Sequence, residues 1–165
     1  MNVIVEIAHD SADWDKYPEF NSEYFAEIAV NILSKYPNFA KVAEFELSIL
    51  LTNAVKMQSL NKEFRQKDKE TNVLSFPDLD INWRRIVEFS VNPEYMYLGD
   101  VAFGFEVIAK EAELKSISLQ HHFKHLVVHA ILHLIGYDHV KEKEAEVMEA
   151  LEIEILKSFG VDSPY

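Results

Sequence analysis

Residues 129–139 read HAILHLIGYDH, and this stretch decides how the rest of the chain is interpreted. A helix advances about 100° per residue, so His129 and His133 project from one face of a helix, one turn apart. Gly136 stands where that helix is expected to end, because glycine adopts the left-handed conformation of a helix C-cap without steric cost. The chain can then turn back and bring His139 to the space in front of the other two imidazoles.

Three imidazoles around one point favour a divalent metal, most often zinc, with one coordination position left for water or substrate. Such an arrangement is typical of a catalytic rather than a structural site. The spacing, glycine included, also matches the zinc-protease pattern HExxHxxGxxH. Ala130 occupies the position of the glutamate base in that pattern. An alanine cannot accept a proton from water, which argues against a peptidase of that class.

The same eleven residues resemble the HGxLHLxGYDH signature of the YbeY family, which comprises bacterial endoribonucleases that mature ribosomal RNA. Two further stretches resemble family blocks in the same order. Residues 60–77, LNKEFRQKDKETNVLSFP, are similar to LNxx[YF]RxxDxxT[DN]VLSFP, and residues 98–101, LGDV, are similar to LGD[IV]. One place departs from the signature: Ala130 stands where the family has glycine. This change should preserve the helix, because alanine is the better helix former by about 1 kcal/mol.

The resemblance implies a metal-dependent endoribonuclease specific for single-stranded RNA, acting in ribosomal RNA processing and ribosome quality control. It implies one Zn²⁺, or another divalent transition metal, held by His129, His133 and His139. Arg65 falls within the matching block and would hold the scissile phosphate in bidentate fashion. The expected partners are ribosomal RNA and the small ribosomal subunit or its assembly factors, with no role for DNA or a membrane.

Three other functions stay open at this point. One is another zinc metallohydrolase, acting on peptides or small molecules, although the missing glutamate speaks against peptides. A second is a non-enzymatic ribosome-assembly factor whose metal stabilises the fold. A third is a metal carrier, which would have no need of Arg65. The group that would take a proton from water is not identified by the sequence.

Further residues are candidates for supporting the site. Asp138 would either orient an imidazole by accepting its free N–H or cap the next helix. His125 continues the ladder of histidines at helical spacing and is expected to pack behind the ligands, whereas the two histidines at 121–122 are expected to be solvated. Ser75 and Asp100 would shape the substrate groove or make buried turn hydrogen bonds.

Composition fits one cytoplasmic domain over residues 1–165. The chain is 48% hydrophobic, enough for a substantial core, and its cysteine count is 0, so disulfides and thiolate ligands are excluded. Charged residues interrupt every apolar run before it reaches the length of a membrane span, and residues 1–6 lack the pattern of a signal peptide.

The net charge of −12 is unfavourable for a protein that binds RNA phosphates. Residues 62–70 differ from the rest, because they hold four basic residues against three acidic ones. The field near Arg65 is therefore expected to be locally positive. We expect weak binding to naked RNA and a need for a protein or ribosomal partner.

Periodicity predicts an α/β (α+β) domain with a small mixed four-stranded sheet, about five helices and a zincin-like metal helix. Strands are expected at residues 3–8, 44–51, 72–76 and 98–103. Helices are expected at residues 21–35, 53–64, 105–114, 119–135 and 141–159. Residues 77–97 contain two prolines and mixed charge and are expected to form an exposed, mobile excursion.

Overall fold

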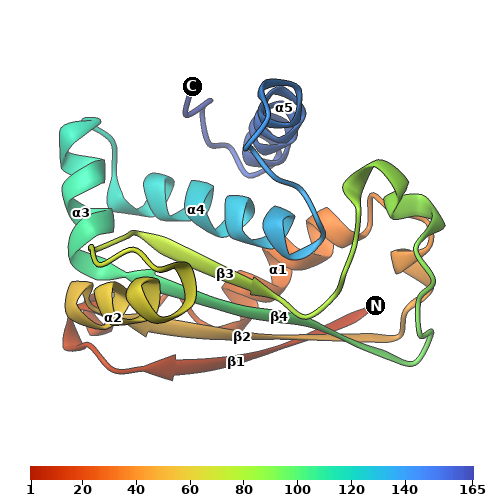
Figure 1. Cartoon of the computed structure of the whole chain (residues 1–165), viewed down its shortest axis with the longest axis horizontal. Coiled ribbons are helices and arrows are strands. Elements are labelled where there is room, and N and C mark those ends of the chain that lie inside the picture. Colours follow the sequence, from red (N-terminus) through yellow and green to blue (C-terminus); the bar gives the residue numbers. More distant parts are fainter.

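A mixed four-stranded sheet forms the centre of the protein, seen in a computed structural model that describes residues 1–165 (Figure 1). Its strand order is β1-β2-β4-β3. The first three strands in this order are parallel, and β3 runs antiparallel to β4 at one edge. The strands are β1 (Asn2–His9), β2 (Glu44–Thr52), β3 (Val73–Pro77) and β4 (Tyr95–Gly104). The predicted mixed four-stranded sheet is confirmed.

All five predicted α-helices are present, and their ends differ by at most two residues from the expected ones. Three short 3₁₀ helices, which the sequence did not indicate, connect the larger elements. The α-helices are α1 (Ser22–Leu33), α2 (Ala54–Arg65), α3 (Phe105–Leu114), α4 (Leu119–Leu134) and α5 (Glu142–Ser158). The 3₁₀ helices are η1 (Ala12–Lys16), η2 (Phe39–Lys41) and η3 (Trp83–Glu88). None of the helices combines the length and the apolar run that crossing a membrane requires.

Alternation along the strands separates the two faces of the sheet. Ile49 and Leu51 of β2 pair with Val101 and Phe103 of β4, and all four are buried in the main core. Leu50 points to the opposite face, where it packs against a smaller apolar cluster under α2. The core therefore lies mainly on the face that α1 and α4 cover.

Helix α4 lies beside β3, with α5 on its side away from the sheet (Figure 1). The helix starts at a serine cap, since the Ser118 side chain accepts a hydrogen bond from the backbone N–H of His121 at 3.1 Å. Most of its residues are buried, Val127 and Ile131 among them. Because α4 is enclosed on both sides, its C-terminal end is held rigidly where the predicted ligands are located.

The segment between β3 and β4 is not the free excursion that the sequence suggested. Ile81 and Ile86 are buried, and Trp83 stacks on Tyr137 with ring centroids 5.4 Å apart. The Asn38 side chain donates hydrogen bonds to two backbone carbonyls of the segment, at 2.8 and 3.1 Å. Other positions of this segment are exposed, as expected, but its apolar residues pack on the turn after α4. The prediction of an exposed segment was wrong for these residues.

Candidate metal centre

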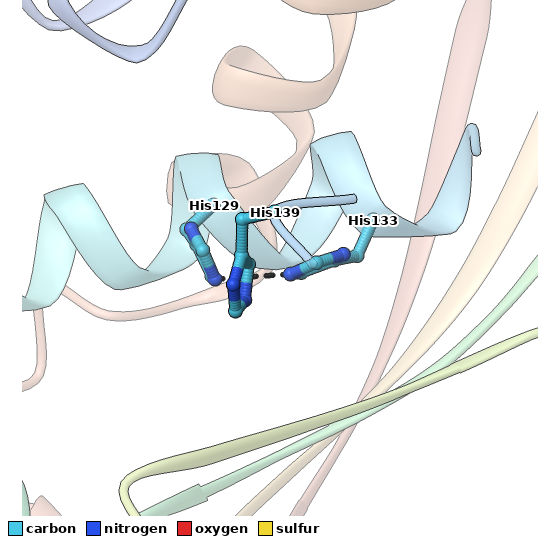
Figure 2. A group of neighbouring side chains, drawn as sticks. All are labelled: His129, His133 and His139. Atoms are coloured by element: carbon cyan, nitrogen blue, oxygen red, sulfur yellow. Dashed lines mark hydrogen bonds between the residues drawn. The ribbon is translucent and has the colours of Figure 1, made fainter. Parts of the chain in front are cut away.

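The end of α4 and the turn after it bring three histidine rings together, and Figure 2 shows them facing one another. The Nε2 atoms of His129 and His133 are 3.0 Å apart. One ring nitrogen of each histidine, His139 included, lies within 4.8 Å of the corresponding nitrogens of the other two. His139 is exposed and the other two are half-buried, so the cluster opens toward solvent.

The turn that delivers His139 depends on glycine. Gly136 has a φ of +98°, and a Cβ atom there would lie 2.2 Å from the carbonyl oxygen of Ile81. The N–H of Tyr137 donates to the Leu132 carbonyl at 3.1 Å, which closes the end of the helix. Glycine is therefore required at this position both for its backbone conformation and for the close approach of the neighbouring segment.

Hydrogen bonds fix the orientation of two of the three rings. Nδ1 of His129 lies 2.5 Å from Oε1 of Glu152, and Nδ1 of His133 lies 2.8 Å from the carbonyl oxygen of Tyr137. Both partners are acceptors, so each Nδ1 carries the proton and each Nε2 presents its lone pair. The two lone pairs face each other across 3.0 Å. A divalent cation satisfies both at once, so the donor set fits zinc.

Burial and the neighbouring histidine favour the neutral, metal-binding form of His133. Burial, followed by the nearby charge of His129, lowers the pKa of His133 to about 4. Burial by itself raises the pKa of Glu152, but hydrogen bonds from His125, His129 and Tyr165 outweigh it and lower that pKa to about 2. The lowered pKa values favour a neutral His133 and an ionised Glu152 at neutral pH.

Arg65 lines the same cavity as the three histidines, a space of about 430 Å³. Its Nη2 donates to the carbonyl oxygen of Ser75 at 2.8 Å, and its guanidinium carbon lies 5.1 Å from the ring centroid of Phe76. Ser75 also lines this cavity, and its hydroxyl donates to the Ala130 carbonyl at 3.5 Å. The cavity therefore combines a candidate metal cluster with a guanidinium that has N–H groups left to donate.

Asp138 lines this cavity but does neither of the two things considered for it. Its Oδ1 accepts the backbone N–H of His139 at 2.7 Å, within the turn itself. Lys141 occupies the N-cap position of α5, and its side chain makes no capping hydrogen bond. No hydrogen bond joins Asp138 to a histidine ring nitrogen. Its carboxylate instead stabilises the turn through the His139 N–H and lines the cavity.

Asp100 is not brought to the candidate site. It pairs with Phe76 in the β3–β4 ladder, accepts a hydrogen bond from the Tyr97 hydroxyl at 3.0 Å and lines a separate apolar hollow on the sheet. Its place in the matching block LGDV reflects this strand position and not a contact with the histidines.

A second cavity, of about 340 Å³, adjoins the first and shares His129 and His139 with it. His125 lines this second space and is largely buried against Glu152, at 3.0 Å. His122 also lines it and is 1% exposed, with its Nε2 atom 3.3 Å from Glu111. The expectation that His122 is solvated was wrong.

Sequence reasoning missed Glu152 and Tyr165. Glu152 is fully buried, and its carboxylate also accepts a hydrogen bond from the Tyr165 hydroxyl. A signal was present, because Glu152 lies at helical spacing between Met148 and Ile155, on the apolar face of α5. A carboxylate at a core position implies a buried partner.

The fold and the site define an α/β protein with a three-histidine cluster of the kind that binds a divalent metal. The family described as Endoribonuclease YbeY matches residues 10–160. The chain belongs to this family, as the sequence motifs indicated.

Known proteins similar to this chain agree with that assignment. A protein named Endoribonuclease YbeY, from Erythrobacter litoralis (strain HTCC2594), is 49% identical over 124 residues, which cover 74% of this chain and 76% of that protein. The solution structure of TM1509 from Thermotoga maritima superposes with a TM-score of 0.55, at 18% identity, over 95% of this chain and 92% of that one. The second likeness supports the fold alone.

Proposed function

We propose that this protein is a metal-dependent endoribonuclease that cleaves single-stranded RNA, with one zinc ion held by His129, His133 and His139. The convergence of the first two rings carries the proposal, because their Nε2 lone pairs meet at 3.0 Å inside a cavity that also contains Arg65. Membership of the endoribonuclease YbeY family supports RNA as the substrate.

The three histidines would hold a zinc ion as a Lewis acid, which would polarise a phosphoryl oxygen and lower the pKa of water. Arg65 binds the scissile phosphate with the guanidinium N–H groups that Ser75 and its own helix do not use. Its stacking on Phe76 keeps the planar group aimed in one direction. The chain thus contributes phosphate binding and orientation from one side of the cavity and the ligand cluster from the other.

The carboxylate chemistry of a zinc peptidase is missing from this cavity. The position at which that class has its glutamate base holds Ala130, which is fully buried and carries no acidic group. Asp138 is the one carboxylate that lines the cavity, and one of its oxygens is engaged by His139. These observations favour phosphodiesters over peptides. The Arg65 guanidinium can donate paired hydrogen bonds to a phosphate, whereas the glutamate base that peptide hydrolysis needs is replaced by alanine.

The net charge of the protein affects its affinity for RNA. The net charge of −12 opposes binding to a phosphate backbone, whereas the four basic residues within 62–70 supply local attraction near Arg65. We propose that ribosomal RNA, presented within the small ribosomal subunit or with an assembly factor, is the substrate, and that processing and quality control of this RNA in the cytoplasm is the role. If the ribosomal particle or an assembly factor brings the RNA to the cavity, the isolated protein does not need to bind RNA tightly.

A substrate panel tests the proposal. Zinc-loaded protein is incubated with single-stranded RNA, duplex RNA, single-stranded DNA of the same sequence and an unstructured peptide. Cleavage of the single-stranded RNA alone, lost with a chelator and restored by zinc, is the expected result. Cleavage of the peptide would contradict the proposal and indicate a different hydrolase. If no polymer is cleaved and the chelator unfolds the protein, a non-enzymatic assembly factor is indicated instead. Ribosomal RNA in small-subunit particles then tests the narrower substrate.

A further inference from the structure

We propose that Glu152 is a positioning residue for the metal site, and that His125 and Tyr165 hold its carboxylate in place. This inference rests on the proposed ligand set and not on the proposed RNA substrate. It assigns a function to residues that no motif of the family singled out in the sequence.

The contacts of Glu152 connect α5 to the candidate site on α4. The residue is 0% exposed, and its two carboxylate oxygens have different partners. Oε1 lies 2.5 Å from Nδ1 of His129, whereas Oε2 lies 3.0 Å from Nε2 of His125 and accepts the Tyr165 hydroxyl. Three donors on one buried carboxylate leave it no alternative orientation.

The chemistry of these contacts determines the state of His129. An ionised carboxylate only accepts hydrogen bonds, so Nδ1 must carry the proton and Nε2 must present the lone pair. The contact also sets the rotation of the ring, with Nε2 facing that of His133 at 3.0 Å. The negative charge behind the imidazole makes it a stronger ligand. The same task at His133 falls to the Tyr137 carbonyl, which belongs to the backbone.

His125 and Tyr165 act one step further from the ligand. Their hydrogen bonds occupy Oε2, so rotation of the carboxylate away from His129 would leave a buried donor unpaired. His125, His129 and Glu152 are also close enough together to hold a cation. Hydrogen bonds already pair these groups, so we infer one metal ion per chain rather than two.

The test is a zinc titration against a competing chelator, with the full-length protein. Glu152→Gln keeps the size of the side chain and removes its charge, and we expect a dissociation constant about 10- to 100-fold larger. Glu154→Gln is the matched control, because Glu154 lies on the same helix and pairs with Lys35 at 2.6 Å away from the histidines. Its dissociation constant should equal that of the wild type.

His133→Ala separates failure of this inference from failure of the ligand set. If His133→Ala retains zinc, the proposed ligands are wrong. If it loses zinc while Glu152→Gln binds as the wild type does, the ligands stand and the positioning role is overturned. Two zinc ions per wild-type chain would also overturn that role, since His125 and Glu152 would then be ligands themselves.

Nitrogen NMR of the histidine rings in metal-free protein gives a reading that does not depend on activity. The wild type should show His129 protonated at Nδ1, and proton occupancy at Nε2 alone would refute the inference. Tyr165→Phe covers the case in which Glu152→Gln fails to fold, because the Tyr165 residue is 60% exposed and its loss is tolerated more easily. We expect it to weaken zinc binding by roughly two- to fivefold, the share of one of three donors. Unchanged affinity in this variant would refute the role given to Tyr165.

Discussion

The two halves of α4 carry the same residue type in different surroundings. The upstream pair, His122 and His125, is buried, and each ring presents Nε2 to a carboxylate, at 3.3 Å and 3.0 Å. The downstream pair, His129 and His133, presents Nε2 from each ring to the other at 3.0 Å, while each Nδ1 meets an acceptor behind it. Spacing along the helix hardly separates the two pairs, since the first two rings are three residues apart and the other two are four apart, and either spacing places both rings on one face.

What separates them is the nitrogen atom left free. A ring whose Nε2 is engaged by a carboxylate has only Nδ1 to offer, and in the upstream pair Nδ1 is buried without a partner. A ring held through Nδ1 offers Nε2 outward, into the space that His139 also reaches. The upstream pair therefore supports the structure around the site, and the downstream pair is suited to bind the metal.

Removal of a downstream ring should have the largest effect. His133→Ala deletes one of three ligands, and a third of the about 12 kcal/mol of a protein zinc site is about 4 kcal/mol, or roughly 10³-fold in dissociation constant. RNA cleavage should be lost with the metal. Competition titration of zinc measures the change, with His122→Ala as the upstream counterpart, expected within about twofold of the wild type. Equal losses in the two variants would abolish the contrast between the pairs.

The next largest effect should fall on cleavage alone. Arg65→Ala removes the guanidinium from the cavity without touching a ring nitrogen, so cleavage should fall by about 10²- to 10³-fold while zinc affinity stays unchanged. Initial rates of cleavage of single-stranded RNA at saturating zinc measure this decrease. Arg65→Lys restores the charge but not the fork of donors and should recover only part of the rate. Full activity in Arg65→Ala would exclude the phosphate-binding role.

A third effect should appear in stability and not in metal binding. His122→Ala removes the buried partner of Glu111, which should lower the free energy of unfolding by about 1–3 kcal/mol. Urea denaturation of the metal-free protein measures this loss. His139→Ala serves as the downstream control, because an exposed ring should contribute less than about 0.5 kcal/mol without metal. The reverse order of the two losses would contradict the assignment of the pairs.

The smallest effect is expected at Asp138. In Asp138→Asn the carboxamide oxygen still accepts the His139 N–H, so the turn persists and only a negative charge near the metal is lost. Zinc affinity should fall about twofold, the size of an exposed charge effect. Cleavage rates at saturating zinc should change as little. A loss near 10²-fold in rate with the metal retained would instead identify Asp138 as the proton acceptor.

Local signals in the sequence were enough to predict much of the fold and the ligand cluster. The helix expected at residues 105–114 has these bounds in the structure, and the helix expected at residues 119–135 is present as α4 (Leu119–Leu134). The spacing of His129, His133 and His139 is also local, because one helix and one glycine turn position all three. These features could be predicted because each depends on residues that are close together in the sequence.

Features that depend on distant contacts were not predictable in this way. Ile81 and Trp83 lie in a segment of mixed charge with two prolines, and only their packing on the turn after α4 shows that the segment is held in place. Glu152 is one of many glutamates in α5, and its role follows from a contact with a residue 23 positions earlier. The burial of His122 likewise follows from α3 and α4 packing together.

The stack of Trp83 on Tyr137 gives the protein an intrinsic optical reporter. The chain has two tryptophans, and Trp14 is 1% exposed within the core, where its emission should be constant. Trp83 rests against the very residue whose carbonyl holds His133, so fluorescence from this indole should change whenever the turn tightens around a cation. Occupancy of the three imidazoles could then be followed in real time, in unlabelled protein, as a change above the constant emission of Trp14.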